Sequence, residues 1–417
     1  MVQALSGTTA ALLEIFIFLA AAEALRLRVR RFQVPPVIGD LLLGMLLAPM
    51  ALGGVLNGLL HYPLFQVTDL LIAFSEFSVI LLIFSAGLEG GISTLRSAGS
   101  YAVLAAVAGN LLPFALTFVA FDRSLGTTSA LLLAVASGAT STAVVVSLIR
   151  EAGLSGTRGG AFLLTTCALD DVVGLIVLST ILAILGGQLS VVAVAGTATL
   201  TVLVWITLLI ASIIAVPRIF RLAGHEEGRN LPFLILFGLA AVVTFVGFSA
   251  IVGAFIAGLA ISESIAGPRA RQTADSLLMI FGALFFVVVG FQFNVRLLLD
   301  PSVLASGLVL AGIAAGGKVV GVILPAQRRF AETSDATMIA VGMIPRGEIG
   351  LLVGAEGIQL GLLSQASLGA IIVMALLTTA IGGVAFQRVA SGARARHALE
   401  MTEGSRTSVP GAPPNGT

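Results

Sequence analysis

Residues 160–184, GAFLLTTCALDDVVGLIVLSTILAI, place two adjacent carboxylic acids in the middle of an otherwise largely apolar run. A run of this length crosses a hydrocarbon core about 30 Å thick as a single helix. An ionised group at that depth costs about 2.5 to 3.5 kcal/mol even on a lenient insertion scale, so Asp170 and Asp171 need a partner or a function. Two acids that cap a helix at the surface would not have apolar sequence on both sides. The stretch therefore predicts a membrane helix with a functional site at its centre.

The whole chain has the composition of a polytopic membrane protein. Of its 417 residues, 58% are hydrophobic and 10% are charged, whereas soluble domains carry about 25% charged residues. The single cysteine, Cys167, excludes a disulfide framework and a thiolate metal cluster. The net charge of +1, with no basic stripe, gives no indication of a nucleic-acid partner. The lipid bilayer is therefore the expected environment.

Hydrophobic segments follow one another along almost the entire chain and predict an all-α protein with about 13 transmembrane helices. The first segment has no basic flank ahead of it, so we expect a retained helix rather than a cleaved signal peptide. The approximate ranges of the segments are 8–27, 37–53, 69–88, 101–121, 129–149, 160–184, 191–215, 231–247, 249–264, 275–293, 302–324, 335–360 and 366–387.

The arginines between these segments predict the orientation. If the N-terminus lies outside, the inside loops and the C-terminal tail carry eighteen arginines, whereas the outside loops carry only Arg123 and Arg296. This positive-inside bias agrees loop by loop and supports an odd number of helices. We therefore expect a multi-pass protein of the inner (plasma) membrane with its N-terminus outside and its C-terminus in the cytoplasm.

The C-terminal residues 391–417 differ from the rest of the chain. They are rich in Gly, Pro, Ser and Arg and contain few apolar residues. Such a composition cannot bury enough apolar surface to fold, so we expect a disordered cytoplasmic tail. The membrane domain accordingly covers residues 1–390, and no second soluble domain is expected.

Two segments are interrupted at their centres. Residues 130–151, ALLLAVASGATSTAVVVSLIRE, contain a run of small and polar residues, and residues 338–357, MIAVGMIPRGEIGLLVGAEG, contain Pro345 and Gly347. Glycine and proline are common in membrane helices, so either interruption alone could be ordinary. The two segments are seven positions apart and run in opposite directions. This pattern predicts an inverted-topology repeat in which two discontinuous helices cross near the midplane and present half-helix ends to a substrate.

Lys318, in GGKVVG at residues 316–321, is the only lysine in the chain. A desolvated ammonium can lose its proton, whereas a guanidinium keeps its charge, so a lysine suits a proton-coupled switch. A fixed ion pair that only joins two helices is the alternative, and both roles need the same contact. Asp170 and Asp171 point about 100° apart around their helix. We therefore expect one to pair with Lys318 and the other to face a water-filled cavity.

A carboxylate in such a cavity can hold either a proton or a hard cation such as Na⁺, but not both together. Competition for one site is the minimal mechanism of antiport, in which a rocking of the helix bundle exposes the site alternately to the two compartments. His61, His225 and His397 all lie outside the hydrophobic segments. Any pH dependence must therefore originate in the carboxylates and the lysine.

With these residues in hand, the chain resembles the bacterial monovalent cation:proton antiporters of the second cation-proton-antiporter family, which contains the NapA-type Na⁺/H⁺ exchangers and the Kef-type K⁺ efflux systems. The resemblance implies a core domain with crossed helices, a dimerisation domain, and a homodimer that works by an elevator-like movement. The motifs that carry the resemblance are VPPVIGDLLLGMLLAP (34–49), VILLIFSAGLEG (79–90), ATSTAVVVSLIREAG (139–153), DD (170–171), SAIVGAFIAGLAIS (249–262), GALFFVVVGFQFN (282–294), GGKVVG (316–321) and GMIPRGEIGLL (342–352).

The resemblance also implies roles for individual residues. Asp171 matches the acid that carries the transported ion, and Asp170 matches the acid that pairs with the lysine, here Lys318. Thr140 and Ser141 match the unwound stretch that helps to line the ion site.

Near the second crossing, Glu348 with Arg346 matches a charged pair of the family. The Asp-Asp version with a lysine resembles electrogenic exchangers, in which more than one proton moves per cation. Kef-type relatives commonly carry a cytoplasmic nucleotide-binding domain, and no regulation by such a domain is expected for this polypeptide. The expected activity is antiport of Na⁺, with Li⁺ or K⁺ also possible cations, without a cofactor and without an enzymatic reaction.

Two alternatives stand beside Na⁺/H⁺ exchange. A K⁺/H⁺ or broad-specificity cation antiporter would use the same acids and differ only in cavity size and field strength. An intramembrane aspartyl protease would also need two aspartates, but on two facing helices, whereas Asp170 and Asp171 adjoin on one. Metalloproteases and serine proteases are excluded because no histidine lies in a hydrophobic segment.

Overall fold

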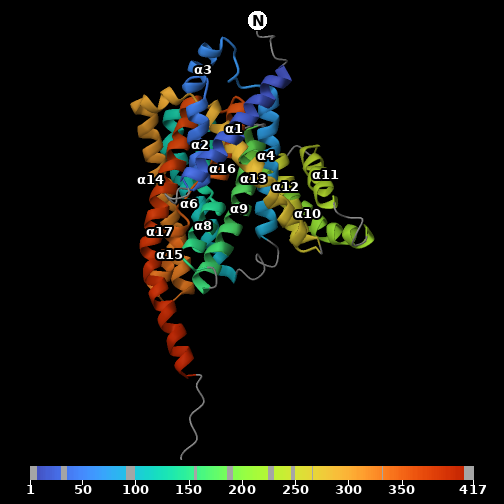
Figure 1. Ribbon diagram of the computed structural model, residues 1–417. Coiled ribbons are helices and arrows are strands. Elements are labelled where there is room, and N and C mark those ends of the chain that lie inside the picture. Colours follow the sequence, from blue (N-terminus) through green and yellow to red (C-terminus); the bar gives the residue numbers. More distant parts are fainter. Residues whose placement is uncertain are drawn as a thin grey trace, which may run out of the picture.

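The computed structural model describes residues 7–29, 35–90, 99–154, 157–185, 191–223, 230–245, 249–264, 266–330 and 332–407. Within these ranges the protein is helical and contains no strand (Figure 1). Its elements are α1 (Gly7–Val29), α2 (Pro36–Leu47), α3 (Leu52–Leu60), α4 (Asp69–Gly90), α6 (Gly99–Leu125), α7 (Thr127–Gly138), α8 (Thr142–Glu151), α9 (Arg158–Leu185), α10 (Val191–Ala223), α11 (Leu231–Phe245), α12 (Ala250–Ser262), α13 (Gly267–Gln292), η2 (Val295–Leu299), α14 (Pro301–Arg329), α15 (Thr333–Gly342), α16 (Glu348–Gln359) and α17 (Gln365–Thr407).

Every predicted hydrophobic segment coincides with one of these helices or with a pair of them. In the described part of the chain, eight helices are long and apolar enough to cross a membrane, or nine if the bent pair α2–α3 forms one span. The eight include the pair α7–α8 as one span. Helix α1, the shorter α11 and α12, and the broken pair α15–α16 do not meet that criterion, so the number of thirteen crossings stays a prediction. The arginine-bearing loops at 30–34, 91–98 and 224–229 lie outside the described residues.

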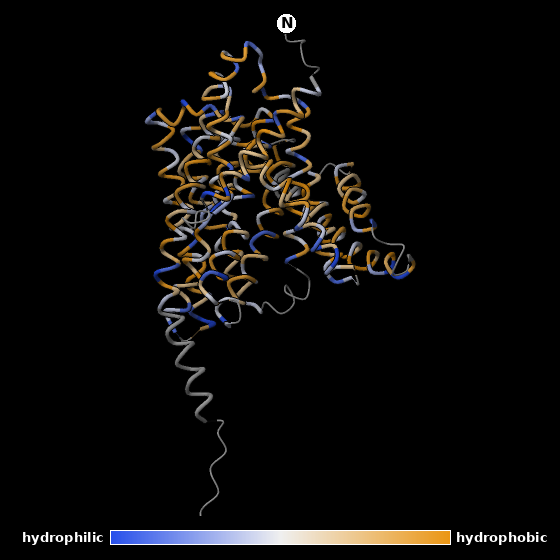
Figure 2. Tube along the Cα trace, in the orientation of Figure 1, coloured by the Kyte–Doolittle hydropathy of each residue, from blue (hydrophilic) through white to orange (hydrophobic). Residues whose placement is uncertain are grey.

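The helical surface suits a hydrocarbon environment. Figure 2 shows helices that are hydrophobic along most of their length, with polar residues concentrated at their ends and at a few interior positions. Large apolar side chains such as Val119, Leu222 and Phe245 are exposed on the outside of the molecule. In water such a surface would be an aggregation hazard, whereas lipid tails solvate it without cost.

The helices form two bundles. The first contains α1, α2, α4, α11, α12 and α13, and the second contains α6 to α9 and α14 to α17. Helix α10 contacts α9 of the second bundle and α12 of the first. Elsewhere the bundles meet along a seam where α4 faces α9 and α13 faces α16. In Figure 1 the labels of α14, α15 and α17 lie on the left and those of α10 to α12 on the right.

Glycines allow the helices of the first bundle to approach closely. A Cβ on Gly258 of α12 would collide with the carbonyl oxygen of Phe84 in α4, and one on Gly87 would collide with the carbonyl oxygen of Phe255. Helices α2 and α13 cross in the same way at Gly44 and Gly290. Small residues at such crossings are the usual basis of helix association in membranes, where the hydrophobic effect does not drive it.

Helix α14 of the second bundle begins at a capped proline. Pro301 occupies the first turn, and Asp300 accepts hydrogen bonds from the backbone nitrogen and the hydroxyl of Ser302, both at 2.8 Å. These two donors hold the pKa of the Asp300 carboxyl below its usual value. The cap fixes where α14 starts, and therefore how deep in the bundle Lys318 lies, about 25 Å along the helix axis.

The segment 391–417, for which a disordered tail is predicted, begins within a helix. Helix α17 continues to Thr407, and its C-terminal end extends beyond the bundles (Figure 1). The reason is local: the segment from Ala393 to Arg406 contains alanine, arginine, glutamate, leucine and methionine, which are good helix formers. Residues 408–417 lie outside the described part of the chain.

We predict that Gly258→Ala destabilises the protein, because the added methyl group must displace the backbone of α4. Overpacking of this kind costs about 1–3 kcal/mol, which lowers the midpoint of heat unfolding, measured by size exclusion of the detergent-solubilised protein. The matched control is Gly312→Ala on α14, where a Cβ meets nothing within 4 Å. Equal midpoints for the two variants would contradict the close contact between α4 and α12.

Candidate functional site

The two interrupted segments cross within the second bundle, as predicted. Helix α7 ends at Gly138 and α8 begins at Thr142, while α15 ends at Gly342 and α16 begins at Glu348. The extended stretches between them are hydrogen-bonded to each other. The backbone nitrogen of Ser141 donates to the carbonyl of Pro345 at 2.9 Å, and Thr140 Oγ1 donates to the carbonyl of Met343 at 3.2 Å. Each break thus satisfies backbone groups that the other leaves open.

The N-terminal ends of α8 and α16 both lie at this crossing. Glu348 is the first residue of α16, and its Oε1 accepts a hydrogen bond from the backbone nitrogen of Ala143 in α8 at 3.3 Å. Backbone donors and the helix dipole favour negative charge at such positions. The crossing therefore provides a partly positive surrounding in which carboxylates can be buried.

The structure places Asp170 and Lys318 together in a fully buried ion pair. Lys318 Nζ lies 2.7 Å from Asp170 Oδ1, and it also donates to the carbonyl oxygen of Gly138 at 2.7 Å. Asp170 accepts two further hydrogen bonds, from Asn110 Nδ2 at 3.2 Å and from the backbone nitrogen of Thr140 at 2.8 Å. A buried pair is tolerated when its remaining lone pairs and protons are satisfied in this way.

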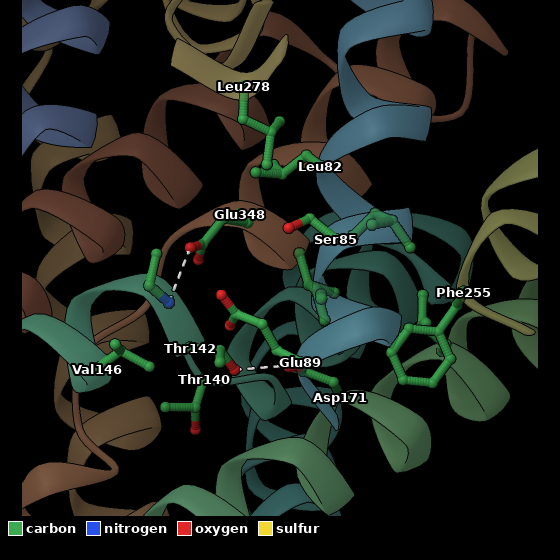
Figure 3. Close-up of a pocket in the computed structure, with 15 residues that line it drawn as sticks. Leu82, Ser85, Glu89, Thr140, Thr142, Val146, Asp171, Phe255, Leu278 and Glu348 are labelled. Carbon is green, nitrogen blue, oxygen red and sulfur yellow. Dashed lines mark hydrogen bonds between the residues drawn. The ribbon is translucent and has the colours of Figure 1, made fainter. Parts of the chain in front are cut away.

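Asp171 points in another direction and lines a cavity of about 230 Å³. Figure 3 shows its carboxylate next to Thr142, whose hydroxyl donates to Asp171 Oδ2 at 2.8 Å. The cavity lies in the seam between the two bundles. Its walls come from α4, α12 and α13 of the first bundle and from α8, α9, α16 and the α7–α8 break of the second. Asp171 is therefore reached by small solutes that enter the seam, whereas Asp170 is closed off.

Glu348 and Arg346 do not form the pair that the sequence suggested. Glu348 faces the cavity, whereas Arg346 is buried away from it and donates to the carbonyls of Met343 and Ala314 at 3.0 and 2.8 Å. Arg346 Nη1 also donates to Thr140 Oγ1 at 3.2 Å. No ion pair joins the two residues among the described contacts. In a straight extended stretch, residues two apart point to the same side. Here the extended stretch ends at Gly347 and α16 begins at Glu348, so the side chains of Arg346 and Glu348 point in different directions.

Thr140 and Ser141 also have different surroundings. Thr140 lines the cavity, but the cavity wall does not include Ser141. The Ser141 side chain is buried and faces Gly347, where an added Cβ would lie 2.7 Å from Oγ. Ser141 therefore supports the crossing rather than lining the site, and it precedes α8 without a side-chain capping bond.

Several residues at the site were missed by the sequence analysis. Asn110 donates to Asp170 and Thr142 donates to Asp171, and the carbonyl of Gly138 accepts a hydrogen bond from Lys318. Glu89 of α4 is a further acid on the cavity wall. Asn110 could have been found as a strongly polar residue inside an apolar segment, and Glu89 as an acid at the end of one. No sequence signal identifies a particular backbone carbonyl.

We predict that Lys318→Met destabilises the protein, because it leaves Asp170 buried without its counter-charge. Breaking a buried pair from one side costs about 3–5 kcal/mol, which appears as a lower midpoint of heat unfolding. The matched control is the double variant Lys318→Met with Asp170→Asn, which removes both charges and recovers most of the loss. If the single variant is as stable as the unmodified protein, the ion pair does not hold α9 against α14.

Comparisons with known proteins agree with this geometry. The chain is 29% identical to the Na⁺/H⁺ antiporter of Enterococcus hirae over 370 residues, which cover 84% of this chain and 91% of that protein. It is 28% identical to the high-affinity Na⁺/H⁺ antiporter NhaS3 of Synechocystis sp., with 89% and 87% covered, and 28% identical to the Na⁺/H⁺-K⁺ antiporter GerN of Bacillus cereus, with 84% and 89% covered.

The fold is similar to that of the sodium proton antiporter MjNhaP1 from Methanocaldococcus jannaschii. The TM-score is 0.67 at 14% sequence identity, and the match covers 91% of this chain and 97% of that structure. At this identity the likeness concerns the fold alone. A sequence family described as "Sodium/hydrogen exchanger, transmembrane" matches residues 15–392, which include both crossed segments and the buried ion pair. The chain therefore belongs to the sodium/hydrogen exchanger family of multi-pass membrane transporters.

Proposed function

We propose that this protein is a secondary transporter that exchanges Na⁺ for H⁺, with Asp171 binding the two ions in turn. The observation that carries the proposal is that the two adjacent acids have different surroundings. Asp170 is neutralised by Lys318 in a closed environment, whereas Asp171 lines an accessible cavity and has no cationic partner among the described ion pairs. Membership of the exchanger family supports the same activity.

Asp171 has the properties of a site for which a proton and a cation compete. A carboxylate oxygen is a hard ligand that suits Na⁺, and the hydroxyl of Thr142 and the side chain of Thr140 border the same cavity. A proton on Asp171 removes the charge that a cation needs, and a bound cation disfavours the proton. Each ion therefore displaces the other, and the gradient of one can drive the transport of the other.

The seam between the bundles contains two cavities, one for each side of the proposed exchange. Besides the cavity at Asp171, a second cavity of about 470 Å³ lies in the seam and includes Glu76, Ser179 and Gln359. Ser179 is eight residues after Asp171 on α9, which is about 12 Å along the helix. We infer that the second bundle slides against the first and exposes Asp171 first through one cavity and then through the other.

The remaining expectations belong to the same proposal. The first bundle would be the dimerisation domain of a homodimer, and the second would be the moving core. The N-terminus would lie outside the plasma membrane, so that the cavity at Asp171 would open toward the cytoplasm. Lys318 would couple protons to the cation through Asp170, and the exchange would be electrogenic. Thr140, Glu348 and Arg346 would position the half-helices around the transported ion.

Potassium is the second candidate cation. One similar protein is named as a Na⁺/H⁺-K⁺ antiporter, and the oxygen ligands near Asp171 do not by themselves reject the larger ion. An aspartyl protease is not favoured, because Asp170 is occupied by Lys318 and cannot share a catalytic proton with its neighbour.

The activity is tested in proteoliposomes that contain a pH-sensitive dye and an imposed proton gradient. Na⁺, Li⁺ and K⁺ are added in turn, with choline as the control cation. Na⁺ is expected to dissipate the gradient, and the response to K⁺ relative to Na⁺ measures selectivity. If none of the three ions changes the interior pH more than choline, the proposed antiport is rejected.

We predict that Asp171→Asn abolishes Na⁺-dependent proton movement while the protein stays folded. The amide keeps the size of the side chain but carries no charge and takes up no proton in this pH range. Exchange is measured in the same proteoliposomes, and folding by size exclusion. The control is Asp69→Asn, at the exposed start of α4, which keeps the rate of the unmodified protein. Full exchange by Asp171→Asn would remove Asp171 from the proposed role.

A further inference from the structure

The cavity beside Asp171 contains two more carboxylates besides the one that exchanges the two ions. Glu348 enters it from the second bundle and Glu89 from the last turn of α4 in the first bundle. Figure 3 shows both side chains directed into the same hollow, together with Asp171. Three acids thus line one small space, although like charges in one cavity repel each other.

Glu348 has one oxygen that lacks a partner. Its side chain is only 8% exposed, its Oε1 accepts from the backbone nitrogen of Ala143, and its Oε2 is buried without a hydrogen-bond donor among the described residues. A buried carboxylate oxygen without a donor is costly, and such atoms in native proteins commonly indicate an ion or a water. Glu348 lines the cavity wall, so a cation in the cavity lies next to this side chain.

Glu89 forms no ion pair within the described ranges, although the charge of Arg271 acts on it. Arg271 of α13 is nearby, but it donates to the carbonyl oxygen of Leu88. The other charged groups that act on Glu89 are Arg150, Asp275 and Glu348, one positive and two negative. The carboxylate therefore adds a net negative charge to the mouth of the cavity.

We propose that Glu89 and Glu348 together bind a second monovalent cation, held between the two bundles beside the transport site. The cavity volume of about 230 Å³ leaves room for a cation with part of its hydration shell, because each water occupies about 30 Å³. The role of this site, which is to supply Asp171 with cations, rests on the proposed exchange. The inference that the site exists rests only on the cavity and its acids.

The two ligands belong to different bundles, and this gives the site a conformational role. A cation between Glu89 and Glu348 offsets their repulsion and favours the relative position of the bundles seen here, since a ligand stabilises the state that it binds better. When the bundles slide, Glu89 and Glu348 separate and the cation is released. The site is thus assembled in one conformation and taken apart in the other.

The test measures equilibrium binding of ²²Na⁺ to purified protein at constant ionic strength, with choline as the replacing cation. In the Asp171→Asn background the transport site is removed, and we expect a weaker binding component to remain. Adding Glu89→Gln is expected to weaken that component at least about fivefold. The control in the same background is Glu76→Gln, on the same helix but in the other cavity, which leaves the binding unchanged.

Two results would overturn the second site. One is the absence of specific Na⁺ binding in folded Asp171→Asn protein, and the other is residual binding that Glu89→Gln does not alter. Failure of the proposed exchange gives a different pattern, in which the unmodified protein moves no protons in proteoliposomes but the Glu89-dependent binding persists. Size exclusion of each variant separates loss of binding from loss of fold, and the glutamine preserves the shape of the side chain.

Discussion

The buried ion pair between Lys318 and Asp170 is the contact on which the architecture of the centre depends. It joins α14 to α9, and the hydrogen bonds around it reach the end of α7 through Gly138, the break through Thr140, and α6 through Asn110. Neither charge has access to water, so neither can be solvated if the other moves away. The pair therefore fixes the positions of five chain segments and keeps the α7–α8 break open in a defined geometry.

The same pair gives two chemically identical neighbours different properties. Asp170 accepts hydrogen bonds from an ammonium, an amide and a backbone nitrogen, whereas Asp171 accepts one from a hydroxyl and faces a cavity. The difference arises because consecutive residues of a helix point about 100° apart, so that one faces the interior of the second bundle and the other the seam. An adjacent pair of acids on one helix is thus a compact way to place a structural charge and an exchangeable one side by side.

The sequence predicted those parts of this arrangement whose burial in lipid costs the most free energy. Charges inside apolar runs, namely Asp170, Asp171 and Lys318, and the paired interruptions at Gly138 and Pro345 stood out because hydrocarbon tolerates few of them. The different directions of Arg346 and Glu348 could not be predicted, since side-chain directions at a helix break depend on backbone angles that composition does not encode. Asn110 and Thr142 were missed because neutral polar residues are common in membrane helices, and only the crossing of distant segments shows which aspartate each one contacts. The tail after residue 390 was judged by its glycines and prolines, although its first half is made of good helix formers.

Helix α10 contacts both bundles, through α9 and α12. Its 33 residues correspond to a helix about 50 Å long, which exceeds the thickness of the hydrocarbon layer, so it lies obliquely or reaches past the edge of that layer. If the bundles slide as proposed, α10 has to tilt or bend in order to keep both contacts. Pro217 removes one backbone hydrogen bond inside this helix and is therefore the position where it bends most easily.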